Sequence, residues 1–206
     1  MIGEIAPGIG YLGLLRVGGF ASNASGSQRV LAAALDQTLR DNDAVVLDLR
    51  TATTGSEAEA LLVATRFVLA RTVVATSAAR VPGVGSVTSG ESVVNPMPTG
   101  AYPGRVVVLI GPGTAGPAEL LALALEPLGA VTLIGEPSAG SPRSPLVRTL
   151  PNGWVLGVPH TEVFATDGTA RVDNPLVPDL IAVVTVADLA SGRDPGIAAA
   201  LEVLAV

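Results

Sequence analysis

The 206-residue sequence contains no cysteine and no lysine, and its only histidine is His160. Without cysteine there can be no disulfide, thiolate metal ligand or cysteine nucleophile. Without lysine there can be no Schiff-base chemistry, covalent pyridoxal phosphate or Ser–Lys dyad. One histidine cannot form a multi-histidine metal site within one chain. Few catalytic routes remain, and we expect neither a metal nor a cofactor.

Charge is also scarce, since only 15% of residues are charged and the formal net charge is -6. No basic cluster is present, which argues against nucleic acid as a partner. No apolar run approaches the roughly 18 residues that a membrane span needs. The N-terminal stretch lacks a basic segment followed by a long apolar one, so we expect no signal peptide and a cytoplasmic protein.

Apolar residues, by contrast, make up 49% of the chain, although aromatic residues contribute only 3%. Alanine, valine and leucine therefore supply most of the apolar surface. Such a chain has more apolar surface than one core of this size needs to bury. A surplus of this kind is typical of an interface between copies or of a site for an apolar ligand. We accordingly expect a homo-oligomer, an apolar small-molecule ligand, or both.

The chain alternates between strand-like and helix-like segments, and its strands are rich in valine without polar alternation. This pattern predicts an α/β fold whose central sheet is buried on both faces. We expect one domain over residues 1–206, with residues 81–104 as a Gly/Pro/Ser-rich surface excursion or lid holding one short strand. Helices are predicted at 25–42, 54–70, from 117 onward and at 194–205. Strands are predicted at 9–17, 43–50, 72–78, 105–111, 130–136 and 180–186, with a hairpin and a further strand within 146–168.

The stretch "GPAE" at 116–119 follows a strand and opens a helix. Gly116 takes the N-cap position, Pro117 the first helical position and Glu119 the third. Glu119 is expected to reach back to the N-cap amide, as in a capping box. The remaining amides at this helix start could bind an oxyanion or a carboxylate. The alternative is an ordinary helix start with no ligand.

Seven stretches occur in one order along the chain: "YLGLLRVGGF", "AVVLDLRTATTG", "GTAGPAELLALAL", "TLIGEPSAG", "LPNGWVLGVP", "NPLVPDLIAV" and "GRDPGIAAALEVL". Together they resemble the protease core of the C-terminal processing (tail-specific) protease family. The resemblance implies a crotonase/ClpP-like ββα core with a central, mostly parallel sheet flanked by helices. No PDZ-like insert is visible in the sequence.

The sequence departs from that family at its reacting groups. The position of the nucleophilic serine is Gly116, and the position of the lysine in the Ser–Lys branch is Ser141. Of the glycine pair that shapes the oxyanion pocket, one is Thr54 and only Gly55 remains. The resemblance therefore implies that peptide hydrolysis by the family mechanism is absent.

The altered motif also resembles the modules of interphotoreceptor retinoid-binding protein, which keep this fold without the serine and carry apolar ligands. That resemblance implies a cleft converted to hold an apolar small molecule. We expect either non-hydrolytic chemistry on it (cyclisation, isomerisation or elimination) or a carrier, with a peptide-end binding module or a residual serine hydrolase as alternatives. The candidate ligand-binding residues are Arg50, Thr53, Thr54, Gly55, Ala115, Gly116, Pro117, Glu119, Ser138, Ser141 and Trp154.

His160 is the one side chain whose ordinary pKa lies near neutrality. Glu162, two residues later, would face the same side of a strand and could orient the imidazole for acid–base catalysis. The alternative is a histidine with a purely structural role. Arg50 and Asp48 are interpreted as an ionic strut at a strand end, although Arg50 could instead hold a ligand carboxylate.

Overall fold

A computed structural model describes residues 1–81, 83–128, 131–143, 146–158 and 161–205. Its centre is a six-stranded sheet in the order β1-β2-β3-β6-β7-β11. β1 runs antiparallel to β2, and all the other neighbours are parallel. The strands are β1 (Ile2–Ala6), β2 (Ile9–Gly13), β3 (Ala44–Asp48), β6 (Arg105–Ile110), β7 (Val131–Gly135) and β11 (Leu180–Ile181).

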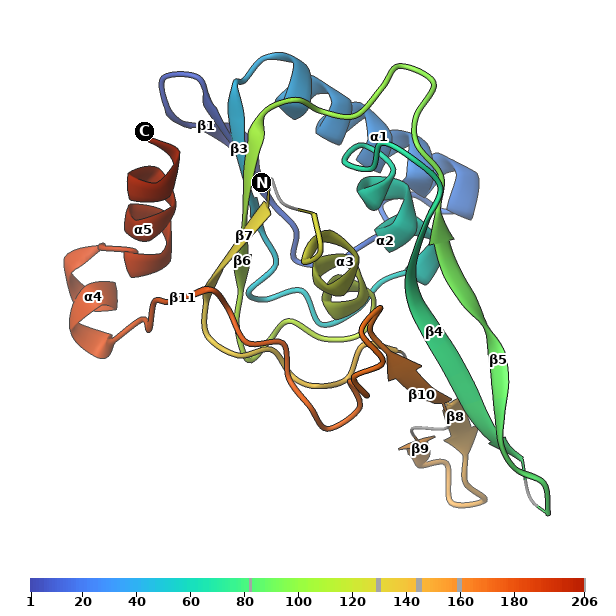
Figure 1. The fold of residues 1–206 in the computed structure, drawn as a ribbon. Helices are drawn as coiled ribbons and strands as arrows, with labels where there is room; N and C mark the ends of the chain where they lie inside the picture. Colours follow the sequence, from blue (N-terminus) through green and yellow to red (C-terminus); the bar gives the residue numbers. More distant parts are fainter. Residues whose placement is uncertain (82, 129–130, 144–145, 159–160, 206) are drawn as a thin grey trace.

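Helices cover both faces of this sheet (Figure 1). One face packs against α1 (Ala24–Arg40), α2 (Glu57–Ala64) and α3 (Pro117–Leu125), and the other against α5 (Pro195–Leu204), which follows the short α4 (Val186–Ser191). Along β6, Val106 and Val108 join the core beside α1–α3, while Val107 and Leu109 join the core beside α5. Because successive strand residues point to opposite faces, burial on both faces requires the unbroken apolar runs seen in the sequence.

A second sheet of three antiparallel strands has the order β10-β4-β5. It is built from β4 (Thr72–Val81), β5 (Gly85–Val94) and β10 (Thr161–Phe164). β5 pairs with β4 from Val94 back to Gly85, so much of the stretch 81–104 is a regular strand. The short strand expected within 81–104 is therefore present but longer than predicted, because glycine and serine did not prevent strand pairing over residues 85–94.

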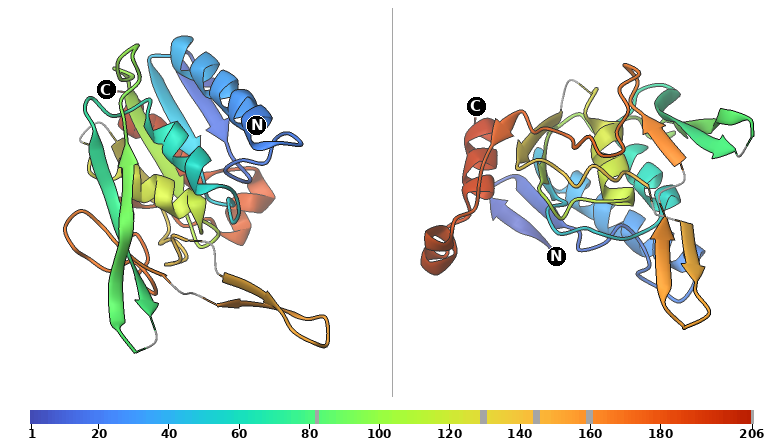
Figure 2. Two further views of the ribbon diagram at one scale, coloured as in Figure 1. Left: turned by 90° about the vertical axis from the view of Figure 1, so that its right-hand side faces the viewer. Right: turned by 90° about the horizontal axis from the view of Figure 1, so that it is seen from below.

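The hairpin of β8 (Leu146–Thr149) and β9 (Val155–Val158) extends away from the body of the molecule (Figure 2). Every residue of both strands is exposed. Trp154, one of the candidate ligand-binding residues, is 72% exposed beside the turn. A two-stranded hairpin whose strands are exposed contributes little stability of its own.

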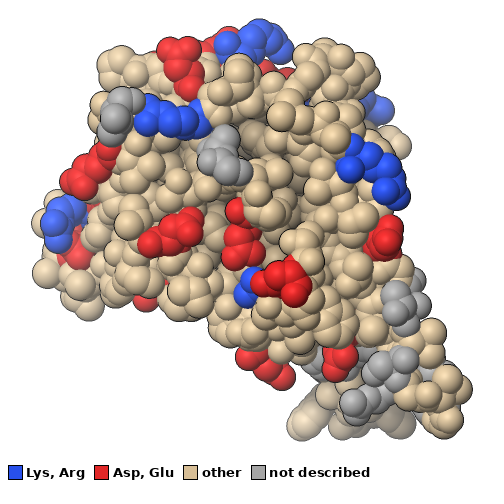
Figure 3. All heavy atoms as spheres, in the orientation of Figure 1, with Lys and Arg blue, Asp and Glu red and all other residues tan. Residues whose placement is uncertain are grey.

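The predicted class is confirmed as a mixed α/β fold with a central, mostly parallel sheet, and no PDZ domain is evident in the described residues. Two elements were missed, the edge strand β1 and helix α4. The last strand is shorter than expected, because β11 ends at Ile181. Among the described residues, none of the helices is both long and apolar enough to cross a membrane. On the face drawn in Figure 3, charged side chains are scattered over a mostly uncharged surface.

Candidate functional site

The start of α3 is a sharp turn out of strand β6. Gly116, its N-cap, has φ +57° and ψ −129°, a conformation that side chains with a Cβ rarely adopt. A strained strand-to-helix turn of this kind is where α/β hydrolases expose a serine nucleophile. A Cβ placed on Gly116 would meet only the carbonyl oxygen of Thr53, at 3.7 Å. The backbone thus keeps the geometry of a nucleophile position and leaves room for a side chain there.

The amides at this helix start are already engaged. The N–H of Gly116 donates to the carbonyl oxygen of Ser141 over 2.6 Å, and the N–H of Ala115 donates to that of Ala52 over 3.2 Å. The expectation of free amides at Gly116 is therefore wrong. Gly116 and Pro117 are buried, whereas Ser141 is exposed.

Glu119 does not cap the helix as predicted but holds the adjacent loop. Its carboxylate accepts hydrogen bonds from the Ser138 hydroxyl (2.6 Å) and from the N–H groups of Gly140 (3.0 Å) and Ser141 (2.7 Å). The side chain is almost completely buried, and burial raises the pKa of Glu119, while these three hydrogen bonds oppose the rise. Glu119 therefore fixes loop 137–143 against the start of α3.

Ser138 is committed to the same network. Its hydroxyl donates to Glu119 and accepts from the N–H of Leu176 over 2.8 Å, and the residue is buried. With both roles of the hydroxyl occupied, Ser138 is a structural residue rather than an accessible nucleophile.

Loop 51–55 forms the other side of the helix start. Thr53, Thr54 and Gly55 are exposed, and the carbonyl oxygen of Thr54 accepts the N–H of Val17 over 2.9 Å. A Cβ on Gly55, whose φ is +153°, would collide with the carbonyl oxygen of Val17. This glycine is required by the close approach of two backbone segments.

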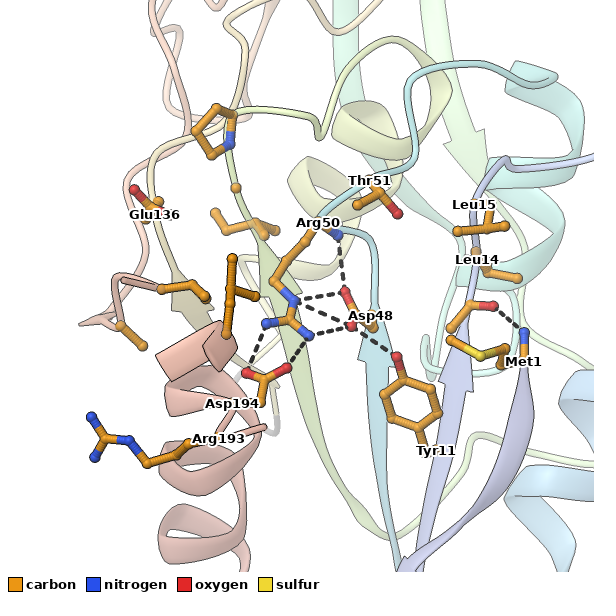
Figure 4. A pocket seen from close by; sticks show the side chains of 17 residues that line it. Met1, Tyr11, Leu14, Leu15, Asp48, Arg50, Thr51, Glu136, Arg193 and Asp194 are labelled. Carbon is orange, nitrogen blue, oxygen red and sulfur yellow. Dashed lines mark hydrogen bonds and ion pairs between the residues drawn. The ribbon is translucent and has the colours of Figure 1, made fainter. Parts of the chain in front are cut away.

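A cavity of about 540 Å³ lies beyond the carboxyl ends of the central strands, on the side of α4 and α5 (Figure 4). Arg50 is the only one of the predicted ligand-binding residues that lines this cavity. None of the described residues of 81–104 lines it. Its lining residues are Met1, Tyr11, Gly13, Leu14, Leu15, Asp48, Arg50, Thr51, Ile110, Gly111, Pro112, Glu136, Ala182, Val184, Leu189, Arg193 and Asp194.

Arg50 lies between two carboxylates at one wall of this cavity. Its guanidinium donates to Asp48 (Nη2 to Oδ2, 2.6 Å) and to Asp194 (Nη1 to Oδ1, 2.8 Å; Nη2 to Oδ2, 2.7 Å), and the Tyr11 hydroxyl also donates to Asp48 over 2.8 Å. The ionic strut predicted for Asp48 and Arg50 is present, and Asp194 extends it to α5 (Figure 4). Because two carboxylates occupy the guanidinium, Arg50 has little capacity left for a ligand carboxylate.

The network shifts the ionisation of its members. Burial opposes the charge of Arg50, but hydrogen bonds to Asp48 and Asp194 outweigh it and raise the pKa of the guanidinium. Burial also opposes the charge of Asp194, and the bonds from Arg50 and from the N–H of Ile197 hold its pKa below the ordinary value. Burial, together with the nearby Asp48 charge, raises the pKa of Tyr11 to about 12. At neutral pH the tyrosine is thus a neutral donor.

The structure describes only one residue of the predicted acid–base pair, Glu162. His160 falls outside the described residues. Glu162 is exposed on β10, opposite Ala78 of β4, and neither lines the cavity nor bonds to the start of α3. Sequence reasoning missed Asp194 as a cavity residue. Its visible signal was as the N-cap of α5, where it accepts the N–H of Ile197.

A parallel sheet covered on both faces, with a strained turn leading from a central strand into a buried helix, defines an α/β protein of the protease-core type. A family model of peptidase family S41 matches residues 9–182, most of the chain. The chain therefore belongs to peptidase family S41. No curated protein matches the sequence.

Solved structures share the fold at low identity. A protein of Parabacteroides merdae ATCC 43184 assigned as a peptidase is 20% identical, with a TM-score of 0.82 over 100% of this chain and 64% of that one. A protein of Bacteroides fragilis NCTC 9343 assigned to the S41 proteases is 21% identical (TM-score 0.72; 96% and 54% covered). The photosystem II D1 C-terminal processing protease is 22% identical (TM-score 0.59; 86% and 44% covered). The chain thus spans less than two thirds of the length of each of these three.

Proposed function

We propose that this chain is a non-proteolytic member of peptidase family S41 that binds an apolar small molecule. The observation that carries the proposal is Gly116 at the strained start of α3, where the family resemblance puts the nucleophilic serine. The Gly116 amide bonds to Ser141, which stands at the position of the family's lysine. A glycine and a serine thus stand at the positions of the nucleophile and the base, and a backbone hydrogen bond joins them.

Support for a small-molecule ligand comes from the cavity at the carboxyl ends of the central strands. Its volume of about 540 Å³ lies within the usual range for small-molecule sites, roughly 300–1,000 Å³. The carboxyl ends of parallel strands are also where α/β proteins commonly bind ligands. The resemblance to retinoid-binding modules remains a prediction, because the matches reported above are to proteases.

Chemistry on the ligand would need no covalent nucleophile. A cyclisation, isomerisation or elimination can be accelerated by positioning and by proton transfer. We assign the proton transfer to His160 and Glu162, and without turnover the same protein would act as a carrier. Exposed apolar residues on the β8–β9 hairpin, among them Val147, Val155 and Leu156, support association between copies of the chain.

The test of non-proteolysis combines two measurements. A fluorophosphonate probe should leave the protein unlabelled, with an active serine hydrolase labelled in parallel as control. Native mass spectrometry of protein purified from its own host should show a co-purifying apolar molecule of defined mass. Labelling of any serine would overturn the proposal, and so would repeated purification of the protein without a bound molecule.

The assignment of His160 has its own test, once the bound molecule is known. The His160→Ala variant should lose turnover of that molecule while keeping the thermal midpoint and circular dichroism of the parent protein. Glu162→Gln should lower turnover less, because it removes only the group that orients the imidazole. Unchanged turnover in His160→Ala would refute the assignment.

A further inference from the structure

Two hairpins extend beyond the body of the molecule in the same direction (Figure 2, left). One is β8–β9, whose turn is followed by Trp154, and the other is β4–β5, whose turn carries Val84. Trp154 is 72% exposed and Val84 is 71% exposed. A flat surface that approaches from this side therefore meets the two turns before it meets the central sheet and its helices.

The ends of both hairpins lack charged residues. No Asp, Glu, Arg or Lys occurs between Arg148 and Glu162, and none occurs within residues 81–90. The whole chain, by contrast, carries a formal net charge of -6. The parts that would make first contact are therefore neutral, while the protein as a whole repels an anionic surface.

The β8–β9 hairpin is apolar on both of its faces. Residues paired across two antiparallel strands share a face, and successive residues alternate between faces. One face holds Leu146, Arg148, Leu150, Trp154, Leu156 and Val158. The opposite face holds Val147, Thr149, Val155 and Gly157. Every residue of both strands is exposed, so each face leaves leucine or valine side chains in contact with water.

Apolar side chains on two faces narrow the choice of partner. A second copy of the chain, or another folded protein, covers the face that it packs against and leaves the other face in water. The headgroup region of a lipid bilayer, in contrast, surrounds an inserted hairpin on all sides. Tryptophan is enriched in that region because its ring is apolar and its indole N–H is a donor.

The backbone limits how deeply the hairpin can enter. β8 and β9 form a sheet of only two strands, so the outer edge of each is not paired within that sheet. Unpaired backbone groups are costly in hydrocarbon, which restricts insertion to the turn and the residues next to it, at headgroup depth. Arg148, opposite Leu156, has a side chain long enough to reach lipid phosphates from this depth.

We propose that the β8–β9 hairpin docks this protein on the surface of a lipid bilayer with zwitterionic headgroups. Leu150, Trp154, Val155 and Leu156 enter the headgroup region, and the turn that carries Val84 makes a second contact. This inference goes beyond the proposed function and does not depend on it. Loss of proteolysis and the ligand of the cavity can each be tested without lipid.

The experiment uses the fluorescence of Trp154, which is the only tryptophan of the chain and therefore reports on this hairpin alone. The protein is titrated with phosphatidylcholine vesicles at pH 7 and low salt. We expect the emission maximum to move to shorter wavelength by about 10 nm, because the indole leaves water for the headgroup region. An unchanged emission maximum at high lipid concentration would overturn the inference.

Three variants test whether both faces take part. Val155→Asp and Leu156→Asp each place a charge on one face of the hairpin, and each should weaken co-sedimentation with the vesicles at least fivefold. Val186→Asp places the same charge on α4, at a residue that is 84% exposed, and should change binding less than twofold. Loss of binding in only one of the two hairpin variants would indicate docking through a single face and contradict the proposal.

Two further measurements separate a neutral lipid surface from other occupants. Replacing one third of the phosphatidylcholine by phosphatidylglycerol should weaken binding at low salt, because the protein carries a net negative charge. Tighter binding to these anionic vesicles would refute the zwitterionic surface. A Trp154 emission shift that appears with rising protein concentration in the absence of lipid would identify a second copy as the occupant, and the inference would fail.

Discussion

The backbone N–H of Gly116 donates to the carbonyl oxygen of Ser141 over 2.6 Å, and this bond joins the first turn of α3 to loop 137–143. Glu119, one turn into the helix, accepts the N–H of the same serine over 2.7 Å. Both backbone polar groups of Ser141 are thus used to fasten the loop to the helix. A substrate that needed the Gly116 amide would first have to displace the Ser141 carbonyl.

Replacing Gly116 tests whether the turn still accepts a side chain. Gly116→Ser should fold, because a Cβ there meets only the Thr53 carbonyl oxygen at 3.7 Å. The positive φ should lower the free energy of unfolding by about 1–2 kcal/mol, measured by urea denaturation. We expect no fluorophosphonate labelling of this variant, since no lysine is available as a base. Gly55→Ser is the matched control and should lose more stability, because its Cβ collides with Val17.

Removing the Glu119 carboxylate should release loop 137–143. Glu119→Ala leaves the donors of Ser138, Gly140 and Ser141 without their acceptor, which should cost about 3 kcal/mol or more of unfolding free energy. Trypsin should then cut after Arg143 much faster than in the parent protein. Glu162→Ala, an exposed carboxylate on β10, is the control; equal trypsin rates in the two variants would show that Glu119 does not hold the loop.

Glu59 is a buried carboxylate whose Oε1 has no partner among the described residues. It lies against Gly18, where a Cβ would collide with it. Glu59→Gln replaces a buried carboxylate that has an unpartnered oxygen with a neutral amide, and should raise the free energy of unfolding by about 1 kcal/mol. Glu57→Gln should act in the opposite direction by up to about 1 kcal/mol, because it removes the ion pair with Arg143 at 3.2 Å. Destabilisation by Glu59→Gln would reveal a role for the charge.

The two tyrosines predict how stability depends on alkaline pH. The pKa of Tyr11 is raised to about 12, chiefly by burial and by Asp48, and that of Tyr102 is raised to about 12 by burial and Asp43. In the unfolded chain both titrate near 10. Between pH 10 and pH 12 the folded state binds more protons than the unfolded state. The contribution of the two tyrosines to stability is therefore fully present below pH 10 and is lost as pH rises toward 12.

Absorbance near 295 nm follows this titration directly, because the chain has only two tyrosines. Neither should ionise at pH 10 in the folded protein. Tyr11→Phe should halve the amplitude of the transition and reduce the loss of stability above pH 10. A tyrosine that titrates near pH 10 in the folded Tyr11→Phe variant would contradict the value for Tyr102.

Local patterns predicted much of the fold. The apolar runs gave β3, β6 and β7, and Asp194 followed by Pro195 correctly marked the start of α5. Strand β5 was predicted too short because Gly85 and Gly90 are poor strand formers, and only pairing with β4 makes them regular.

The candidate site was less predictable than the fold. Gly116 could be placed at a helix start from its immediate neighbours, but its bond to Ser141 and the loop-holding role of Glu119 depend on how distant segments meet. Asp194 reaches Arg50 across 144 positions of sequence, a separation over which no local pattern carries information.

The wide separation of Arg50 and Asp194 in the sequence also determines the order in which contacts can form while the chain is made on the ribosome. Strands β3 and β6 can pair while the chain is still being made, but the sheet face carrying Val107 and Leu109 stays bare until α5 has emerged. Until then the guanidinium of Arg50 can pair with Asp48 but not with Asp194. The nascent protein should therefore expose a chaperone-binding surface late in translation, and premature stop codons before residue 194 should yield chains that aggregate rather than shortened but folded proteins.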